Sequence, residues 1–128
     1  MKVLLWLDDV RNPFIADWLM QYAPQFAYGE GTTVWVKNYN EFVEWIEANG
    51  LPHTIAFDHD LGFTNEYYIE NDLPSPEPDK SGFDCAKWVV EYCLNNKVEL
   101  PQWTVQSANP TGRDNINGLL NNYRKHSQ

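Results

Sequence analysis

Residues 54–62 read TIAFDHDLG, and this stretch decides how the rest of the chain can fold. The apolar run stops abruptly at Asp58, His59 and Asp60. A short apolar run without alternation is typical of a strand buried on both faces, as in a parallel sheet that helices cover on each side. Ligands of such sheets bind outside the carboxyl ends of the strands. We therefore expect these three polar residues to lie at a cleft.

A second run of this kind, VLLWL at residues 3–7, also ends in two carboxylates, Asp8 and Asp9. Two more strands are predicted over 32–36 and 103–106, where β-branched and aromatic residues gather. The strand before Asp58 is expected to begin at position 53. This alternation of strands and helical segments predicts a three-layer α/β/α fold with a four-stranded parallel sheet of order 2-1-3-4.

Four helices are expected from the spacing of apolar residues and from start and end signals. The first helix is expected to start at Asn12-Pro13 and to end at Pro24, and the second to be capped by Asn38 or Asn40 and to end at Gly50. The third is expected to start at the cap Ser81, to which Asp84 can reach back. The last helix is indicated by its apolar positions Ile116, Leu119, Leu120 and Tyr123.

The length of 128 residues and a hydrophobic content of 43% predict one domain over residues 1–128. Its irregular part is the loop 63–80, which holds three prolines and several acidic residues. Loops this long inside a small domain are usually functional or disordered. Two interpretations remain open, a lid beside the cleft and a passive insertion.

The formal net charge of −9 argues against a general nucleic-acid binder or a membrane-surface protein, because phosphate backbones require a basic surface. A small phosphorylated ligand remains compatible with it, whereas a protein partner cannot be identified from the sequence. Two cysteines at helical spacing are expected to be free core thiols. No signal peptide and no apolar stretch of about 20 residues is found, so we expect a cytoplasmic location.

Strand order reverses between the first and third strands, and this switch point brings Asp8 and Asp9 beside Asp58 and Asp60. Gathered carboxylates repel one another unless a cation joins them. Oxygen ligands favour Mg²⁺ or Mn²⁺. We expect Asp8, Asp9 and Asp58 to hold this metal. The alternative is that one or two of them only cap neighbouring helices or face water.

Two residues beside Asp58 are candidates for proton transfer. His59 has an ordinary pKa of about 6.5 and could be a general acid or base. It could equally tie down the loop or pack under it. Asp60 falls in the turn after the strand and is the other candidate.

Three further residues could bind a phosphate. Arg11 could clamp it in bidentate fashion, or it could pair with Asp8 or Asp60. Ser107 and Asn109 follow the fourth strand and could orient a phosphate, together with N–H groups at the start of the last helix. Their alternative role is ordinary turn chemistry.

Four ordered motifs resemble the cyclic-phosphate-processing receiver-like domain family. They are LDDVRNP at 7–13, FDHDLG at 57–62, SGFD at 81–84 and VQSANPTG at 105–112. The family consists of small stand-alone proteins, many from phages and bacteria. The resemblance implies a receiver (flavodoxin-like) fold. It also implies hydrolysis or processing of a cyclic phosphate, such as that of a cyclic nucleotide.

One departure from the family pattern is Gln106, where the family has histidine. Glutamine can hydrogen-bond a phosphate but cannot exchange a proton near neutral pH. Compared with signalling receivers, Asp9 resembles their metal-binding acid and Asp58 occupies the place of their phosphoacceptor. The lysine that those receivers carry after the final strand is absent.

We therefore expect a Mg²⁺-dependent, phosphodiesterase-like hydrolase. Asp58, His59 and Asp60 would be catalytic, and Arg11 would bind substrate with Ser107 and Asn109. Two alternatives are a degenerate receiver phosphorylated on Asp58 and a non-catalytic module that binds a protein.

Overall fold

The structure is a computed structural model, and it describes residues 2–9, 11–15, 18–27, 31–59, 61, 80–106 and 109–126. Two predicted site residues, Asp60 and Ser107, lie outside the described residues. So does the predicted loop 63–80 except for Lys80. Its interpretation as a lid or as an insertion therefore stays a prediction.

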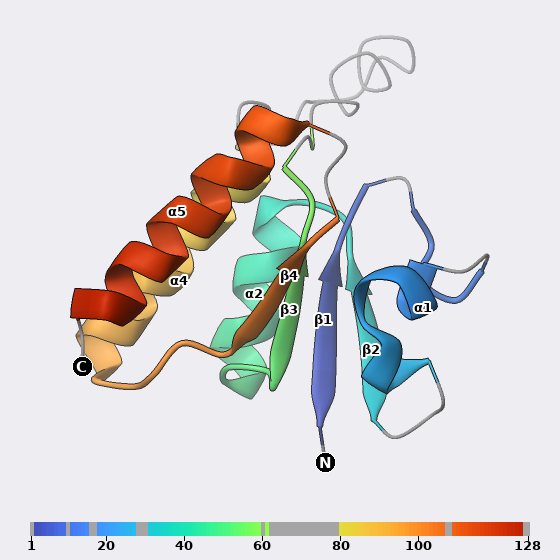
Figure 1. The fold of residues 1–128 in the computed structure, drawn as a ribbon. Helices are drawn as coiled ribbons and strands as arrows, with labels where there is room; N and C mark the ends of the chain where they lie inside the picture. The colour runs from blue at the N-terminus through green and yellow to red at the C-terminus, as the bar shows by residue number, and fades with distance from the viewer. Residues whose placement is uncertain are drawn as a thin grey trace, which may run out of the picture.

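Four parallel strands form one sheet of order β2-β1-β3-β4, as the sequence predicted (Figure 1). The strands are β1 (Val3–Leu7), β2 (Thr32–Val36), β3 (Thr54–Phe57) and β4 (Gln102–Val105). The predicted bounds of β3 and β4 are each wrong by one residue. Gln106 therefore stands just beyond the end of β4 and not inside it.

Helices cover both faces of the sheet. The short helix α1 (Trp18–Tyr22) and the 3-10 helix η1 (Pro24–Phe26) pack on one face, against Leu4 and Trp6 of β1. The longer helices α2 (Tyr39–Asn49), α4 (Gly82–Asn96) and α5 (Pro110–His126) pack on the other face (Figure 1). Alternate residues of β1 face opposite cores, because successive side chains of a strand point to opposite faces. The result is the predicted three-layer fold.

Helix ends follow the polar residues that the sequence offers. Asn38 caps α2, since its side chain accepts a hydrogen bond of 2.9 Å from the backbone N–H of Glu41. This decides between Asn38 and Asn40. Gly50 ends the helix at a φ of 83°, which favours glycine. Ser81 and Asp84 form the predicted capping box at the start of α4.

The predicted start of the first helix at Asn12-Pro13 is wrong, because α1 begins at Trp18. Residues 13–15 form a turn instead. The side-chain Oδ1 of Asn12 accepts a hydrogen bond of 2.9 Å from the N–H of Phe14, and the backbone carbonyl of Asn12 accepts one of 3.2 Å from the N–H of Ile15. An asparagine side chain that bonds the local backbone competes with helix formation in this way.

Both cysteines of the sequence lie in α4. Cys85 and Cys93 of α4 are buried and free, as predicted. Burial raises the pKa of the Cys93 thiol to about 11.

Among the described helices, none combines the length and the apolar character that crossing a membrane would require.

Candidate functional site

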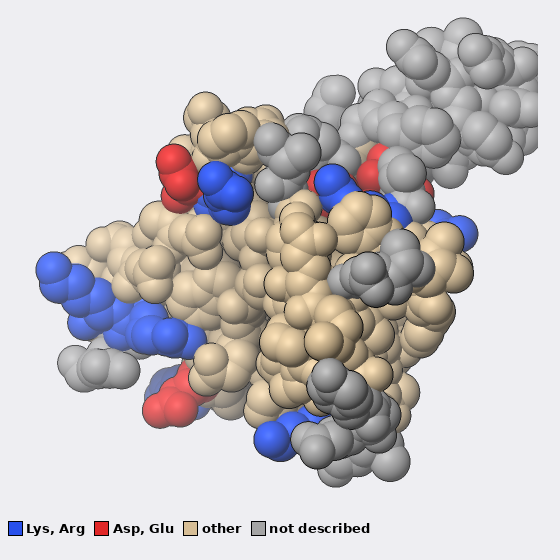
Figure 2. Space-filling model, turned by 45° about the vertical axis from the view of Figure 1, so that its right-hand side comes forward, with Lys and Arg blue, Asp and Glu red and all other residues tan. Residues whose placement is uncertain are grey.

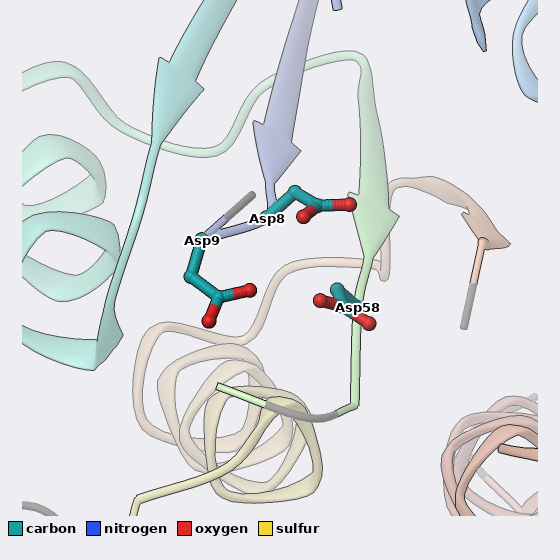
Figure 3. A group of neighbouring side chains, drawn as sticks. All are labelled: Asp8, Asp9 and Asp58. Atoms are coloured by element: carbon teal, nitrogen blue, oxygen red, sulfur yellow. The ribbon is translucent and has the colours of Figure 1, made fainter. Parts of the chain in front are cut away.

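Three carboxylates meet where β1 and β3 end. Asp8 and Asp9 follow β1, Asp58 follows β3, and each offers an oxygen within 4.8 Å of the others (Figure 3). The sheet fixes these positions, because the N–H of Asp8 donates to the carbonyl of Val36 and the N–H of Asp58 to that of Leu7, both at 3.0 Å. The clustering predicted from the strand order is therefore present for Asp8, Asp9 and Asp58, whereas the fourth predicted member, Asp60, lies outside the described residues.

Burial makes this cluster electrostatically costly. Asp8 is fully buried and Asp58 is 5% exposed. Burial, and then the charge of Asp8, raises the pKa of Asp9 above its ordinary value, and a backbone hydrogen bond, Arg11 and Asp58 oppose this only in part. The Oδ2 atom of Asp9 is buried and has no hydrogen-bond partner among the residues that the structure describes. A buried acceptor of this kind needs an explanation such as an ion.

Arg11 places a cationic side chain at this cluster. Its Nη1 lies 3.1 Å from Oδ2 of Asp8 and 3.9 Å from Oδ1 of Asp58, and its backbone N–H donates to Oδ1 of Asp8 at 2.8 Å. The guanidinium carbon lies 5.3 Å from the ring centroid of Trp18. The predicted pairing with Asp8 is confirmed, whereas a phosphate role for Arg11 stays a prediction. Within the described ranges, the ion pairs of Arg11 set one guanidinium against a cluster of three carboxyl groups.

Two tryptophans that the sequence analysis missed hold the backbone of this site. The indole N–H of Trp35 donates to the carbonyl of Asp8 at 2.7 Å, and that of Trp6 donates to the carbonyl of Arg11 at 3.0 Å. The two residues are direct partners in the register of β1 and β2. Trp6 stands two residues before Asp8 in the sequence, and Trp35 lies on the neighbouring predicted strand. This proximity to Asp8 was the signal that could have identified them.

The predicted residues His59 and Asn109 come together at the first turn of α5. The His59 imidazole lies against Gly112, and the Asn109 Oδ1 accepts a hydrogen bond of 3.0 Å from the N–H of Gly112. The carbonyl of His59 accepts one of 2.9 Å from the N–H of Gly82. His59 thus packs between the starts of α4 and α5. The loop that it could tie down or pack under lies outside the described residues, so both that alternative and the proton-transfer role stay predictions.

Gln106 lies in the core rather than in the cleft. It is fully buried, and its Nε2 donates to the carbonyl of Leu7 at 2.9 Å and to that of Ala56 at 3.5 Å. These bonds tie the end of β4 to β1 and β3, so the amide N–H groups are engaged by the backbone. The suggestion that Gln106 could bond a phosphate is therefore not supported.

The face of the molecule drawn in Figure 2 carries charges of both signs. In Figure 2, Lys and Arg side chains lie beside Asp and Glu side chains near the upper edge, and most of the visible described surface belongs to other residues. The Lys and Arg side chains of the described residues form several separate groups on this face, of which one runs along the left edge. The expectation against general nucleic-acid binding agrees with this view but stays a prediction.

A parallel sheet of order 2-1-3-4 with acidic residues at the ends of β1 and β3 defines a receiver-type, flavodoxin-like α/β domain. The sequence profile of the family described as the cyclic-phosphate processing receiver domain matches residues 3–122, so the chain belongs to this family. The resemblance seen in the four motifs is thereby confirmed, and the chain is a receiver-like domain associated with cyclic-phosphate processing. Comparisons with curated proteins and with solved structures find no match.

Proposed function

We propose that this receiver domain is a divalent-metal-dependent hydrolase that opens a cyclic phosphoester, such as that of a cyclic nucleotide. The observation that carries the proposal is the cluster of Asp8, Asp9 and Asp58, in which a buried Asp9 oxygen has no hydrogen-bond partner within the described part of the chain. Burial is the largest cause that raises the pKa of Asp9, and repulsion from the charge of Asp8 is the second. A cation at this point would remove that repulsion and give the oxygen a partner.

The donor set fits Mg²⁺ or Mn²⁺. All three candidate ligands are carboxylates, and hard cations prefer oxygen ligands. When bound, such an ion polarises a phosphoryl oxygen and lowers the pKa of a bound water. Asp8, Asp9 and Asp58 would hold it. Ion pairing with Arg11 would orient two of these carboxylates, since Nη1 of Arg11 lies near both Asp8 and Asp58.

The remaining residues would bind and protonate the substrate. The Arg11 side chain is 23% exposed, so guanidinium N–H groups beyond Nη1 could reach phosphate oxygens. Asn109 and Ser107 follow β4 and would flank the same phosphate. Opening a cyclic phosphoester requires a proton for the leaving oxygen. His59 or Asp60 would donate it.

A hydrolysis screen tests the proposal. The purified protein is incubated with 2′,3′- and 3′,5′-cyclic nucleotides and with cyclic-phosphate RNA ends, in Mg²⁺, Mn²⁺ or EDTA, and the opened phosphomonoester is measured. We expect turnover that needs the divalent cation. Asp58→Asn should lower it by about 100-fold or more. The control Asp114→Asn removes an exposed carboxylate of α5 and should keep the wild-type rate.

Two outcomes would contradict the proposed hydrolase activity. One is the absence of turnover across the panel, and the other is full activity in a folded Asp58→Asn variant. Incubation with acetyl phosphate and Mg²⁺ then tests the signalling alternative, because a receiver phosphorylated on Asp58 gains the mass of one phosphoryl group. A deletion within the loop 63–80 that spares turnover but abolishes capture of a partner would favour the protein-binding alternative.

A further inference from the structure

His59 is held by glycines from two different helices. On one side, the N–H of Gly82 at the start of α4 donates to the carbonyl of His59 at 2.9 Å. A Cβ atom on Gly82 would lie 2.7 Å from the carbonyl carbon of Asp58 and 3.0 Å from the Cα of His59. Glycine at position 82 therefore lets the helix start approach the backbone directly after β3.

On the other side, Gly112 in the first turn of α5 touches the imidazole itself. A Cβ atom on Gly112 would lie 2.7 Å from Nδ1 and 2.7 Å from Cδ2 of His59, and real Cβ atoms essentially never come so close. Gly112 is also buried. Any other residue at this position would push the ring away from α5 or push α5 away from β3.

A second glycine in the same helix shows that this contact is particular to Gly112. Gly118 is exposed, and a Cβ atom there would meet no atom of the described residues within 4 Å. Glycine in a helix interior is about 1 kcal/mol less favourable than alanine. At Gly118 alanine would meet no obstacle, whereas at Gly112 it would meet the His59 ring.

We infer that Gly112 is a positioning residue for His59. Because residue 112 has no side chain, the imidazole can lie directly against α5, and this contact sets the orientation of the ring at the end of β3. The inference rests on the proposed function only in its consequence, namely that His59 transfers a proton. The orientation itself can be measured without any substrate. Asn109 supports the same turn, since its side chain accepts the N–H of Gly112.

The matched pair Gly112→Ala and Gly118→Ala tests the inference. The sequence has three histidines, and ¹H–¹³C spectra resolve their ring signals, with His59→Ala supplying the assignment. We expect Gly112→Ala to shift the signals of His59 alone and Gly118→Ala to shift none. If the two alanine variants give the same His59 signals, Gly112 does not position the ring.

A double-mutant cycle separates contact with the ring from a general need for glycine. Gly112→Ala should lower the thermal midpoint of the wild type but not that of His59→Ala, in which the ring is gone. A drop of equal size in both backgrounds would overturn the inference. If Gly112→Ala fails to fold, recovery of folding in the double variant supports the contact, and failure of both variants contradicts it.

Kinetics connect the position of the ring to turnover. In Gly112→Ala, kcat should fall by about 100-fold with KM nearly unchanged, since a small misplacement of a reacting group has an effect of this size. Gly118→Ala should keep the wild-type kcat. Absence of turnover in the wild type would defeat the proposed function, while the spectra and the cycle would still decide the role of Gly112.

Discussion

Gln106, just beyond β4, donates a hydrogen bond of 2.9 Å to the carbonyl of Leu7, although β3 lies between β4 and β1. The residue after Leu7 is Asp8, the most buried member of the acidic cluster. The Nε2 atom of Gln106 also lies 3.5 Å from the carbonyl of Ala56, two residues before Asp58. A single amide therefore joins the two strand ends that carry the carboxylates.

Two substitutions of Gln106 should separate the effects of its amide. Gln106→Leu removes the Nε2 donor together with the buried Oε1 atom, which has no partner among the described residues. The Leu7 carbonyl would still accept the N–H of Asp58. Gln106→Glu instead places an acceptor oxygen opposite the carbonyls of Leu7 and Ala56. We expect a loss of about 1 kcal/mol for Leu and of roughly 3 kcal/mol or more for Glu.

Urea denaturation of the wild type and the two Gln106 variants at pH 7 measures these differences in unfolding free energy. The far-UV circular dichroism of each variant serves as the control for folding. A glutamate variant that is as stable as the leucine variant would contradict the assigned orientation of the amide.

Divalent cations should stabilise the wild-type fold. Ligand at 100 times its dissociation constant adds about 2.7 kcal/mol, which raises the thermal midpoint of a domain of this size by roughly 10 °C. Asp58→Asn should lose most of this increase, because it removes one of the three clustered carboxylates. Differential scanning fluorimetry with Mg²⁺, Mn²⁺ or EDTA measures the effect, with Asp114→Asn as the control. Equal increases in Asp58→Asn and the wild type would argue against this metal site.

Asp9 should make the stability of the metal-free protein depend on pH. Burial and then the charge of Asp8 raise its pKa above the ordinary value of 3.8, so the folded state holds this proton more tightly than the unfolded state does. Its contribution is therefore favourable below pH 3.8 and is lost as the pH rises through the folded pKa. Raising the pH from 3.8 to 7 therefore lowers the contribution of Asp9 to the unfolding free energy.

It follows that Asp9→Asn should melt at a higher temperature than the wild type at pH 7 in EDTA. The difference should shrink as the pH is lowered toward 4. Thermal melts of both proteins across this range measure it, and the difference between them cancels the titration of other groups. A lower melting temperature for Asp9→Asn at pH 7 would show that Asp9 stabilises the metal-free fold.

The capping box of α4 should act as one unit. The Ser81 N–H donates to the Asp84 Oδ2 at 2.8 Å, and the Phe83 N–H donates to the Ser81 hydroxyl at 3.2 Å. Ser81→Ala should lower the unfolding free energy by about 1 kcal/mol. Asp84→Ala should have a similar effect, and the double variant should lose less than the sum of the two. Urea denaturation checks this, and strictly additive losses would contradict the reciprocal arrangement.

Local signals allowed much of this fold to be predicted from the sequence. The unbroken apolar runs before Asp8 and Asp58 indicate strands buried on both faces, and alternation with helical spacing implies parallel pairing. From the strand order alone, Asp8, Asp9 and Asp58 could be expected to meet. Ser81 with Asp84 has the spacing of a capping box, which depends only on neighbouring residues. Asn12-Pro13 misled for the same reason, because its local pattern suits either a helix start or a turn.

The tertiary structure decided which contacts those residues make. Arg11 could have paired with several carboxylates, and only the folded backbone brings it to Asp8 and Asp58. Nothing near Gln106 in the sequence indicates that its amide would reach Leu7, 99 residues away. The contact between the His59 ring and Gly112 likewise depends on how α5 packs beside β3. Periodicity and capping report short-range preferences, whereas burial, ion pairing and steric fit arise between segments that only folding brings together.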